Sequence, residues 1–268
     1  MTLRLLVSDV DGTLVRDDKS LSEAVVAAVS RLHDAGVPTA LISARPPSGL
    51  AWIAARLGLR TPLAAFNGGT ILDPDGATLF AARLAPAVAT RALALIRQPN
   101  VMRWLFSAGR WHAERVDDIY TPLERQSANQ EPAVGDFSAA PGAIDKIVAV
   151  SDDPQLLADL EVQLTAAIGH EATVVRSQPY YLDITASAAN KGHGIEALAR
   201  AAGVALAEVA AIGDQRNDIA MFARAGWSIA MGQGPEEVRR AATFVTGTNE
   251  ADGVMQAIDR ILLPMRRV

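Results

Sequence analysis

The sequence of 268 residues contains no cysteine. This absence excludes disulfide bonds, thiolate zinc sites and cysteine nucleophiles. No uncharged apolar segment reaches the roughly 18 residues that a membrane-spanning helix requires. The first residues run directly into Asp9, without the longer apolar stretch and cleavage site of a signal peptide. We therefore expect a cytoplasmic protein that has no membrane partner.

The chain also lacks long runs of basic residues, and its formal net charge is −5. This charge pattern disfavours non-specific binding of nucleic acid, and we expect no nucleic-acid partner. What it does have is apolar residues, at 50% of the chain, although aromatic residues contribute only 5%. This composition indicates a globular protein with a large core and one or two domains.

Strands and helices are expected to alternate in the first third of the sequence. Apolar runs predict strands over Leu3–Asp9, Val37–Ser43 and Pro62–Phe66. The segment Ser20-Leu-Ser-Glu23 is typical of a capping box that opens a helix, and a second helix is expected around Gly49–Leu57. This alternation predicts an α/β fold with a parallel sheet covered by helices on both faces.

The pattern changes near residue 83 and returns near residue 184. Short strands, helices and most of a small set of aromatic side chains lie between these points, and Asp73-Pro-Asp-Gly76 before them predicts a hairpin turn. We predict a discontinuous catalytic core, residues 1–82 and 184–268, with an inserted α/β cap domain over 83–183.

Four polar segments follow apolar strands or begin a helix. They are Asp9-Val-Asp-Gly-Thr13, Ser43 at the end of the second strand, Lys191 in the first turn of a helix, and Gly213-Asp-Gln-Arg-Asn-Asp218 after a late strand. The carboxyl ends of parallel strands lie at one edge of a sheet, which is where ligands bind. These segments should therefore converge although they are far apart in sequence.

The residue types in these segments suit phosphoryl transfer. Asp9 is the candidate nucleophile, since a carboxylate can attack phosphorus, and Asp11 is the candidate general acid and base. Asp9, Asp214 and the backbone carbonyl of Asp11 could hold Mg²⁺, which favours oxygen ligands. Lys191 and the Ser43 hydroxyl could bind the phosphoryl oxygens.

In this order, the four segments resemble those of the haloacid dehalogenase-like superfamily, and the insertion resembles that of its Cof-type phosphatase branch. Further marks are Phe66-Asn-Gly-Gly69, Asn190-Lys-Gly192 and Asn249…Asp252-Gly253. The resemblance implies a Rossmann-like core, a mobile cap and Mg²⁺-dependent phosphatase chemistry. Two segments depart from the branch: Ser43-Ala-Arg45 replaces Thr-Gly-Arg, and Gly232-Gln-Gly-Pro235 replaces Gly-Asn-Ala.

Several further residues are candidates for the site. Asn217 is assigned to phosphate binding, although it could equally be a helix cap, and Asp218 is expected to anchor Lys191 from outside the metal site. Arg45 is expected to be structural. The candidates for substrate specificity lie in the cap and are Trp111, His112, Arg176 and Tyr181.

The sequence thus predicts a Mg²⁺-dependent phosphatase that hydrolyses small phosphate monoesters through a phosphorylated Asp9. The substrate could be a sugar phosphate, a nucleotide or a phosphorylated cofactor. The same residues would serve a phosphomutase or phosphotransferase acting on sugar phosphates, and a non-catalytic ligand-binding member of the fold is a further alternative. The sequence does not distinguish a monomer from a homodimer.

Overall fold

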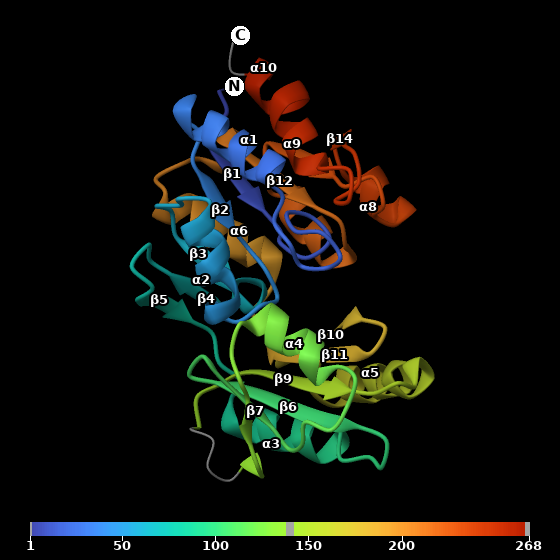
Figure 1. Ribbon diagram of the computed structural model, residues 1–268. Helices are drawn as coiled ribbons and strands as arrows, with labels where there is room; N and C mark the ends of the chain where they lie inside the picture. The colour runs from blue at the N-terminus through green and yellow to red at the C-terminus, as the bar shows by residue number, and fades with distance from the viewer. Residues whose placement is uncertain (1, 138–141, 266–268) are drawn as a thin grey trace.

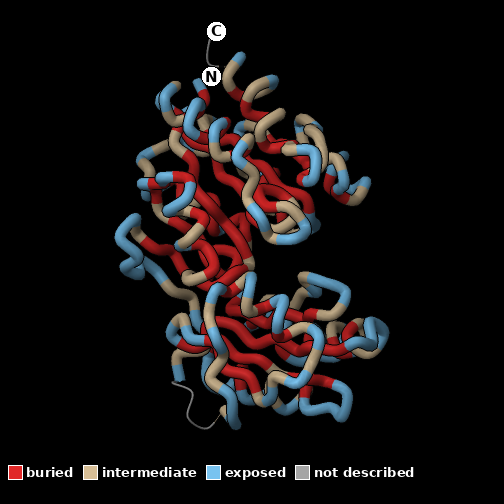
Figure 2. Tube along the Cα trace, in the orientation of Figure 1, coloured by how far each residue is buried: buried red, intermediate tan, exposed pale blue. Residues whose placement is uncertain are grey.

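A computed structural model of the protein describes residues 2–137 and 142–265. The chain forms two lobes, a core that contains both ends of the described chain and a cap inserted into it (Figure 1). Most strands of both lobes are buried, whereas the exposed residues lie mainly in loops and on the outer faces of helices (Figure 2). The predicted α/β fold class is confirmed. None of the helices in the described part of the chain combines the length and apolar character that crossing a membrane requires.

The core is built on a five-stranded sheet with the order β14-β13-β12-β1-β2, in which all neighbouring strands are parallel. Its strands are β1 (Leu5–Ser8), β2 (Thr39–Leu41), β12 (Val209–Gly213), β13 (Trp227–Ala230) and β14 (Phe244–Val245). Because β1 pairs with β12 as well as with β2, segments from both ends of the sequence meet at the centre of the sheet.

Helices cover both faces of this sheet, as the alternating strands and helices predicted. Along β1, Leu6 packs into the cluster that includes α1 and α9, whereas Leu5 and Val7 pack against α6, α7 and α8 on the other face. Burial of such side chains contributes about 1.5–3 kcal/mol each. The helices of the core are α1 (Glu23–Asp34), α2 (Pro47–Arg56), α6 (Lys191–Ala201), α7 (Ile219–Phe222), α8 (Glu236–Ala241), α9 (Gly253–Ala257) and α10 (Leu263–Met265), with a π-helix at Ile258–Leu262.

A small antiparallel sheet extends the core toward the cap. It consists of β3 (Leu63–Ala65), β4 (Thr70–Leu72) and β5 (Thr78–Ala81), and a bridge from Ile42 to Ala64 joins it to the end of β2. The predicted hairpin between β4 and β5 is confirmed. Asp73 forms its turn, because Oδ1 accepts hydrogen bonds from the N–H groups of Asp75 and Ala77 at 3.0 and 2.8 Å.

The cap contains a six-stranded sheet with the order β10-β11-β9-β6-β7-β8. Its strands are β6 (Met102–Ser107), β7 (Arg110–Ala113), β8 (Ala133–Val134), β9 (Ile144–Val150), β10 (Ala172–Gln178) and β11 (Tyr181–Ala186). Two helices, α3 (Pro86–Leu95) and α5 (Pro154–Ile168), pack on one face, and α4 (Thr121–Ala128) lies between the sheet and the core (Figure 1).

Three local features differ from the sequence-based expectations. The last cap strand pairs with β10 as far as Ala186, so the cap sheet passes the predicted boundary at residue 183. Helix α1 is capped by Ser22, whose Oγ accepts from Val25 N–H at 3.2 Å, and not by Ser20. Asn217, for which a helix cap was the alternative role, lies inside a 3₁₀ turn, Arg216–Asp218, that precedes the short α7 (Ile219–Phe222). Residues 1, 138–141 and 266–268 of the predicted domains lie outside the described residues.

Candidate active site

Asp9 directly follows β1 at the carboxyl edge of the core sheet. Its N–H still donates to the Ile212 carbonyl of β12 at 2.9 Å, so the sheet fixes its backbone. The chain then turns at Gly12, which has φ +74°, and a Cβ atom at this position would lie 2.4 Å from Oδ2 of Asp214. Glycine therefore allows the turn and lets the loop after β12 approach the loop after β1.

Lys191 forms ion pairs with two carboxylates in the interior. Its Nζ lies 2.7 Å from Oδ1 of Asp9 and 2.6 Å from Oδ1 of Asp218, and all three side chains are buried. The Asn190 side chain caps α6 by accepting from His193 N–H at 3.0 Å, which fixes the first turn that carries Lys191. Burial would lower the pKa of Lys191, but Asp218 and Asp9 outweigh it and hold that pKa above its ordinary value.

Asp218 holds the loop after β12 in place. While Oδ1 accepts from Lys191, Oδ2 accepts from the N–H groups of Asp214 and Gln215, both at 2.8 Å. Both oxygens are therefore already occupied. This geometry matches the expectation that Asp218 anchors Lys191.

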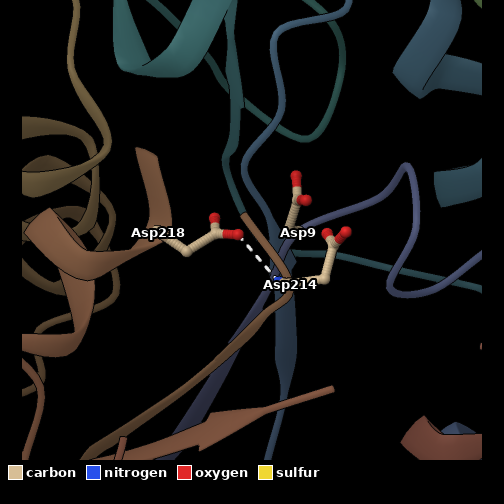
Figure 3. Close-up of side chains that lie close together, drawn as sticks. All are labelled: Asp9, Asp214 and Asp218. Carbon is tan, nitrogen blue, oxygen red and sulfur yellow. Dashed lines mark hydrogen bonds between the residues drawn. The ribbon is translucent and has the colours of Figure 1, made fainter. Parts of the chain in front are cut away.

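Three carboxylates gather where the loops meet. One oxygen of each of Asp9, Asp214 and Asp218 lies within 4.8 Å of the others. The Asp9 and Asp214 carboxylates lie side by side, and Asp218 reaches the Asp214 backbone (Figure 3). Thr13 Oγ1 orients Asp214 by donating to its Oδ1 at 3.0 Å.

The electrostatics of this cluster suit a hard cation. Burial, together with repulsion from Asp218 and Asp214, raises the pKa of Asp9 despite Lys191. Burial and the charge of Asp218 likewise raise the pKa of Asp214 to about 6. Carboxylates held together against repulsion are the oxygen donors that Mg²⁺ binds, and the residues present therefore fit the expected metal. The Asp11 carboxylate is not part of this cluster.

Asp11 instead pairs with two cations. Arg45 binds both of its oxygens, through Nε at 2.7 Å and Nη2 at 2.8 Å, and Lys19 Nζ lies 2.9 Å from Oδ1. Burial alone would raise the pKa of Asp11, but Arg45 and Lys19 hold it below its ordinary value. Arg45, expected to be structural, thus contacts the candidate acid and base directly.

Ser43 and Asn217 lie on opposite sides of the Asp9 loop, and both line the cavity described below. The buried Ser43 Oγ accepts from Arg45 N–H at 3.2 Å. Asn217 Nδ2 donates to Oδ1 of Asn67 at 3.3 Å, whereas its own Oδ1 is buried and has no partner among the described residues. A free acceptor of this kind is available to a ligand or a water molecule.

The site opens into a cavity of about 850 Å³ between the two lobes. Its core side includes Asp9, Asp11, Ser43, Lys191 and Asn217, which the structure brings together as predicted; its cap side includes Glu124, Lys146, Arg176, Tyr180 and Tyr181. A cavity of this size accommodates a small molecule.

Only two of the four predicted specificity residues line this cavity, namely Arg176 and Tyr181. Trp111 is fully buried, with its ring centroid 5.2 Å from that of Trp104, and it packs in the aromatic layer between cap and core. His112 lies opposite Leu105, on the face of the cap sheet that α3 and α5 cover. The expectation of substrate contact was wrong for Trp111 and His112. Side chains alternate along β7, so Trp111 points into the aromatic layer and His112 points to the opposite face of the cap sheet.

Lys19, Glu124 and Lys146 are residues of the site that were not singled out from the sequence. Lys19 lies in an exposed turn and carries no motif, and Glu124 lies in a polar segment for which the sequence defines no element. Lys146 did carry a signal, because it is a charged residue within the apolar strand β9.

The unusual segment Gly232-Gln-Gly-Pro235 supports the loop after β1. The Gln233 side chain donates to the Gly12 carbonyl at 2.5 Å and accepts from Asn249 N–H at 3.2 Å. Pro235 lines the cavity. The segment that departs from the branch pattern therefore connects its own loop with the loops that carry Gly12 and Asn249 at the edge of the site.

Comparisons with known proteins agree with this architecture. The family model of haloacid dehalogenase-like hydrolases matches residues 6–258. The chain is 30% identical to the HMP-PP phosphatase of Cronobacter sakazakii over 85% of this chain and 84% of that protein. It is 28% identical to the 5-amino-6-(5-phospho-D-ribitylamino)uracil phosphatase YitU of Bacillus subtilis, over 93% and 94% of the two chains.

A solved structure extends the similarity to the whole fold. The crystal structure of a haloacid dehalogenase-like hydrolase from Bacteroides thetaiotaomicron matches with a TM-score of 0.88 and 27% identity, over 97% of this chain and 100% of that one. The resemblance identified from the four polar segments is confirmed, and the chain belongs to the haloacid dehalogenase-like hydrolases.

Proposed function

We propose that this protein is a phosphatase that hydrolyses small phosphate monoesters through a phosphorylated Asp9. The observation that carries the proposal is the position of Asp9, which is buried, ion-paired with Lys191 and open to the cavity. The similarity to phosphatases of small phosphate esters supports the same reaction class. Mg²⁺, held by Asp9 and Asp214 with the backbone carbonyl of Asp11, would supply positive charge beside the phosphoryl group.

The reaction proceeds in two displacements. An Asp9 oxygen attacks phosphorus, the ester oxygen leaves with a proton from Asp11, and an aspartyl phosphate forms. Water then attacks phosphorus and gives a proton to Asp11, which releases inorganic phosphate and regenerates the Asp9 carboxylate. Lys191, Ser43 and backbone N–H groups stabilise the phosphoryl oxygens in both transition states.

The contacts of Asp11 place a condition on this scheme. Its carboxylate is bound by Arg45 and Lys19, which favour the ionised form. Asp11 can donate a proton only after giving up part of these contacts. We therefore infer that productive substrate binding rearranges the Asp11–Arg45 pair.

Phosphate release from a panel of metabolite esters in the presence of Mg²⁺ tests the proposed function. Sugar phosphates, nucleotides and phosphorylated cofactors should be compared with the generic substrate p-nitrophenyl phosphate. Turnover by the native protein and its loss in Asp9→Asn would support the proposal. A bisphosphate requirement with little free phosphate would instead indicate a phosphomutase.

A further inference from the structure

Glu124 is a buried carboxylic acid on the cap side of the cavity. It lies in the first turn of α4, only 8% of its surface is exposed, and it lines the cavity. The charges that act on it are those of Lys146 and Asp183 in the cap and of Asp11 and Arg45 in the core. Glu124 therefore lies where the two lobes meet, close to the residues that surround the reacting phosphate in the proposed function.

Glu124 differs from the other charged residues of the cavity in having no partner. The others are paired as follows: Asp9 with Lys191, Asp11 with Arg45 and Lys19, Asp17 with Asn249, Lys146 with Asp183, Glu161 with Arg176, and Arg216 with Glu237. Within residues 2–137 and 142–265, the Glu124 side chain makes neither an ion pair nor a hydrogen bond. Burial raises the pKa of Glu124 to about 7, because the charged carboxylate loses much of its hydration and gains no ion pair or hydrogen bond in return.

The position of Glu124 is fixed by both ends of α4. At the start, Oδ1 of Asp118 accepts from the N–H groups of Tyr120 and Thr121, both at 2.7 Å. At the end, Ser48 of the core donates from Oγ to the Ala128 carbonyl at 2.5 Å. These contacts hold the helix at both ends and fix the backbone that carries Glu124.

We propose that Glu124 is a specificity-determining residue that accepts a hydrogen bond from a hydroxyl or amino group on the leaving group of the substrate. This inference rests on the proposed function, since it assumes a phosphate ester bound at Asp9. A leaving group that extends from Asp9 past Asp11 approaches α4, and a donor on it satisfies the one unpaired charged group there. An ester without such a donor leaves Glu124 buried and unpaired.

Matched pairs of esters test this role. Glucose 6-phosphate and glucosamine 6-phosphate carry donors on the leaving group, whereas cyclohexylmethyl phosphate has a similar ring without them. For each protein, kcat/KM is measured for the three esters and for p-nitrophenyl phosphate. The preference is the larger kcat/KM of the two sugar esters divided by that of cyclohexylmethyl phosphate. We expect Glu124→Leu to reduce this preference by about 10- to 150-fold, as for a lost hydrogen bond to a charged group, while Glu124→Gln retains part of it.

Glu131→Leu is the matched control, because Glu131 is also a cap carboxylate but its side chain is 75% exposed and lies outside the cavity. It should leave the preference unchanged, and p-nitrophenyl phosphate, which carries no hydrogen-bond donor, reports any general loss of activity in the Glu124 variants. The proposal is wrong if the native protein shows no preference for donor-bearing esters or if Glu124→Leu retains it. It is also wrong if that variant, still folded by circular dichroism, loses activity equally on all esters.

A binding measurement separates this proposal from the proposed function. Calorimetry with Asp9→Asn gives the affinity for the same esters without turnover, with and without Glu124→Leu. If the native protein hydrolyses no ester, the proposed function fails, but the affinity ratio still reports on Glu124. An affinity ratio that does not depend on Glu124 would then overturn the inference by itself.

Discussion

Lys191 and Asp9 form a buried ion pair in which Nζ lies 2.7 Å from Oδ1, although the two residues are far apart in the sequence. The helix dipole destabilises a cation in the first turn of a helix, so the charge of Lys191 requires nearby negative charge. Asp9 and Asp218 supply it from either side. The lysine therefore both orients the candidate nucleophile and joins the loops after β1 and β12.

Replacing Lys191 should destabilise the protein as well as inactivate it. Lys191→Met leaves two buried carboxylates without their counter-ion, and we expect the free energy of unfolding to fall by about 3–5 kcal/mol. Arg216→Met is the control, because it breaks an exposed ion pair with Glu237 and should cost less than about 1 kcal/mol. Urea unfolding in the presence of a chelator measures both, and equal losses would contradict a structural role for Lys191.

Removal of divalent metal should abolish turnover. The Asp9–Asp214–Asp218 cluster is buried, and the pKa values of Asp9 and Asp214 are raised by burial and mutual repulsion, which a cation would relieve. Phosphate release after exhaustive chelation and after addition of Mg²⁺ or Ca²⁺ checks this. We expect Mg²⁺ to restore activity and Ca²⁺ to do so poorly, since its larger and looser coordination shell misplaces the ligands. Full activity in the chelated protein would rule out the metal assignment.

The two aspartates of the first loop should fail at different steps. Asp9→Asn removes the attacking charge, so turnover should fall by several orders of magnitude, about 4 kcal/mol or more in the barrier. Asp11→Asn should also be slow, but it should let the phosphorylated protein accumulate, because the base that activates water is absent. Mass spectrometry of acid-quenched reactions distinguishes them. Asp18→Asn, an exposed carboxylate of the same loop, should remain active.

Gly12 offers a test of how closely the two loops must approach. Gly12→Ala places a Cβ 2.4 Å from Oδ2 of Asp214 and also strains a backbone at φ +74°. We expect activity to fall more than about tenfold, with weaker activation by Mg²⁺. Gly76→Ala separates the two causes, because Gly76 has φ +88° but nothing within 4 Å of a Cβ. Gly76→Ala should lose about 1 kcal/mol of stability and keep its activity. If both variants lost activity equally, backbone strain alone would explain the effect of Gly12→Ala.

The core of the site was predictable because parallel strands end at one edge of a sheet. Asp9, Ser43 and Asp214 each follow an apolar strand, so the sheet brings them together whatever lies between them in sequence. The contacts of Asp11 were not predictable, since they depend on the direction in which Lys19 and Arg45 leave two separate loops. Long-range side-chain pairs of this kind have no local sequence signal.

The cap was predictable as an insertion but not in its details. The change of pattern near residues 83 and 184 indicated the insertion, yet which face of the cap sheet would meet the core depends on packing between distant segments. Glu124 shows the consequence: its segment is polar and without clear periodicity, but α4 forms there, with Asp118 accepting from the N–H groups of Tyr120 and Thr121 at its start and α2 packed against it. Tertiary contacts, and not local propensity, determine this helix.

Substitutions of Arg176 and Trp111 should distinguish a cap residue that recognises substrate from one that stabilises the fold. Arg176 lines the cavity and is held by Glu161, with Nε 2.8 Å from Oε2, whereas Trp111 has no exposed surface and packs against Trp104 and Phe106. We expect Arg176→Ala to change relative kcat/KM values among natural esters. It should leave p-nitrophenyl phosphate hydrolysis within about tenfold, or roughly 1.4 kcal/mol.

Trp111→Ala should instead remove packing in the aromatic layer between cap and core. Its free energy of unfolding should fall by about 3–5 kcal/mol, with the order of substrate preference retained in the fraction that stays folded. Urea unfolding and the ester panel measure the two effects on the same preparations. A change of substrate preference in Trp111→Ala without loss of stability would contradict this supporting role. It would mean that the Trp111 ring leaves its buried position and contacts the substrate during turnover.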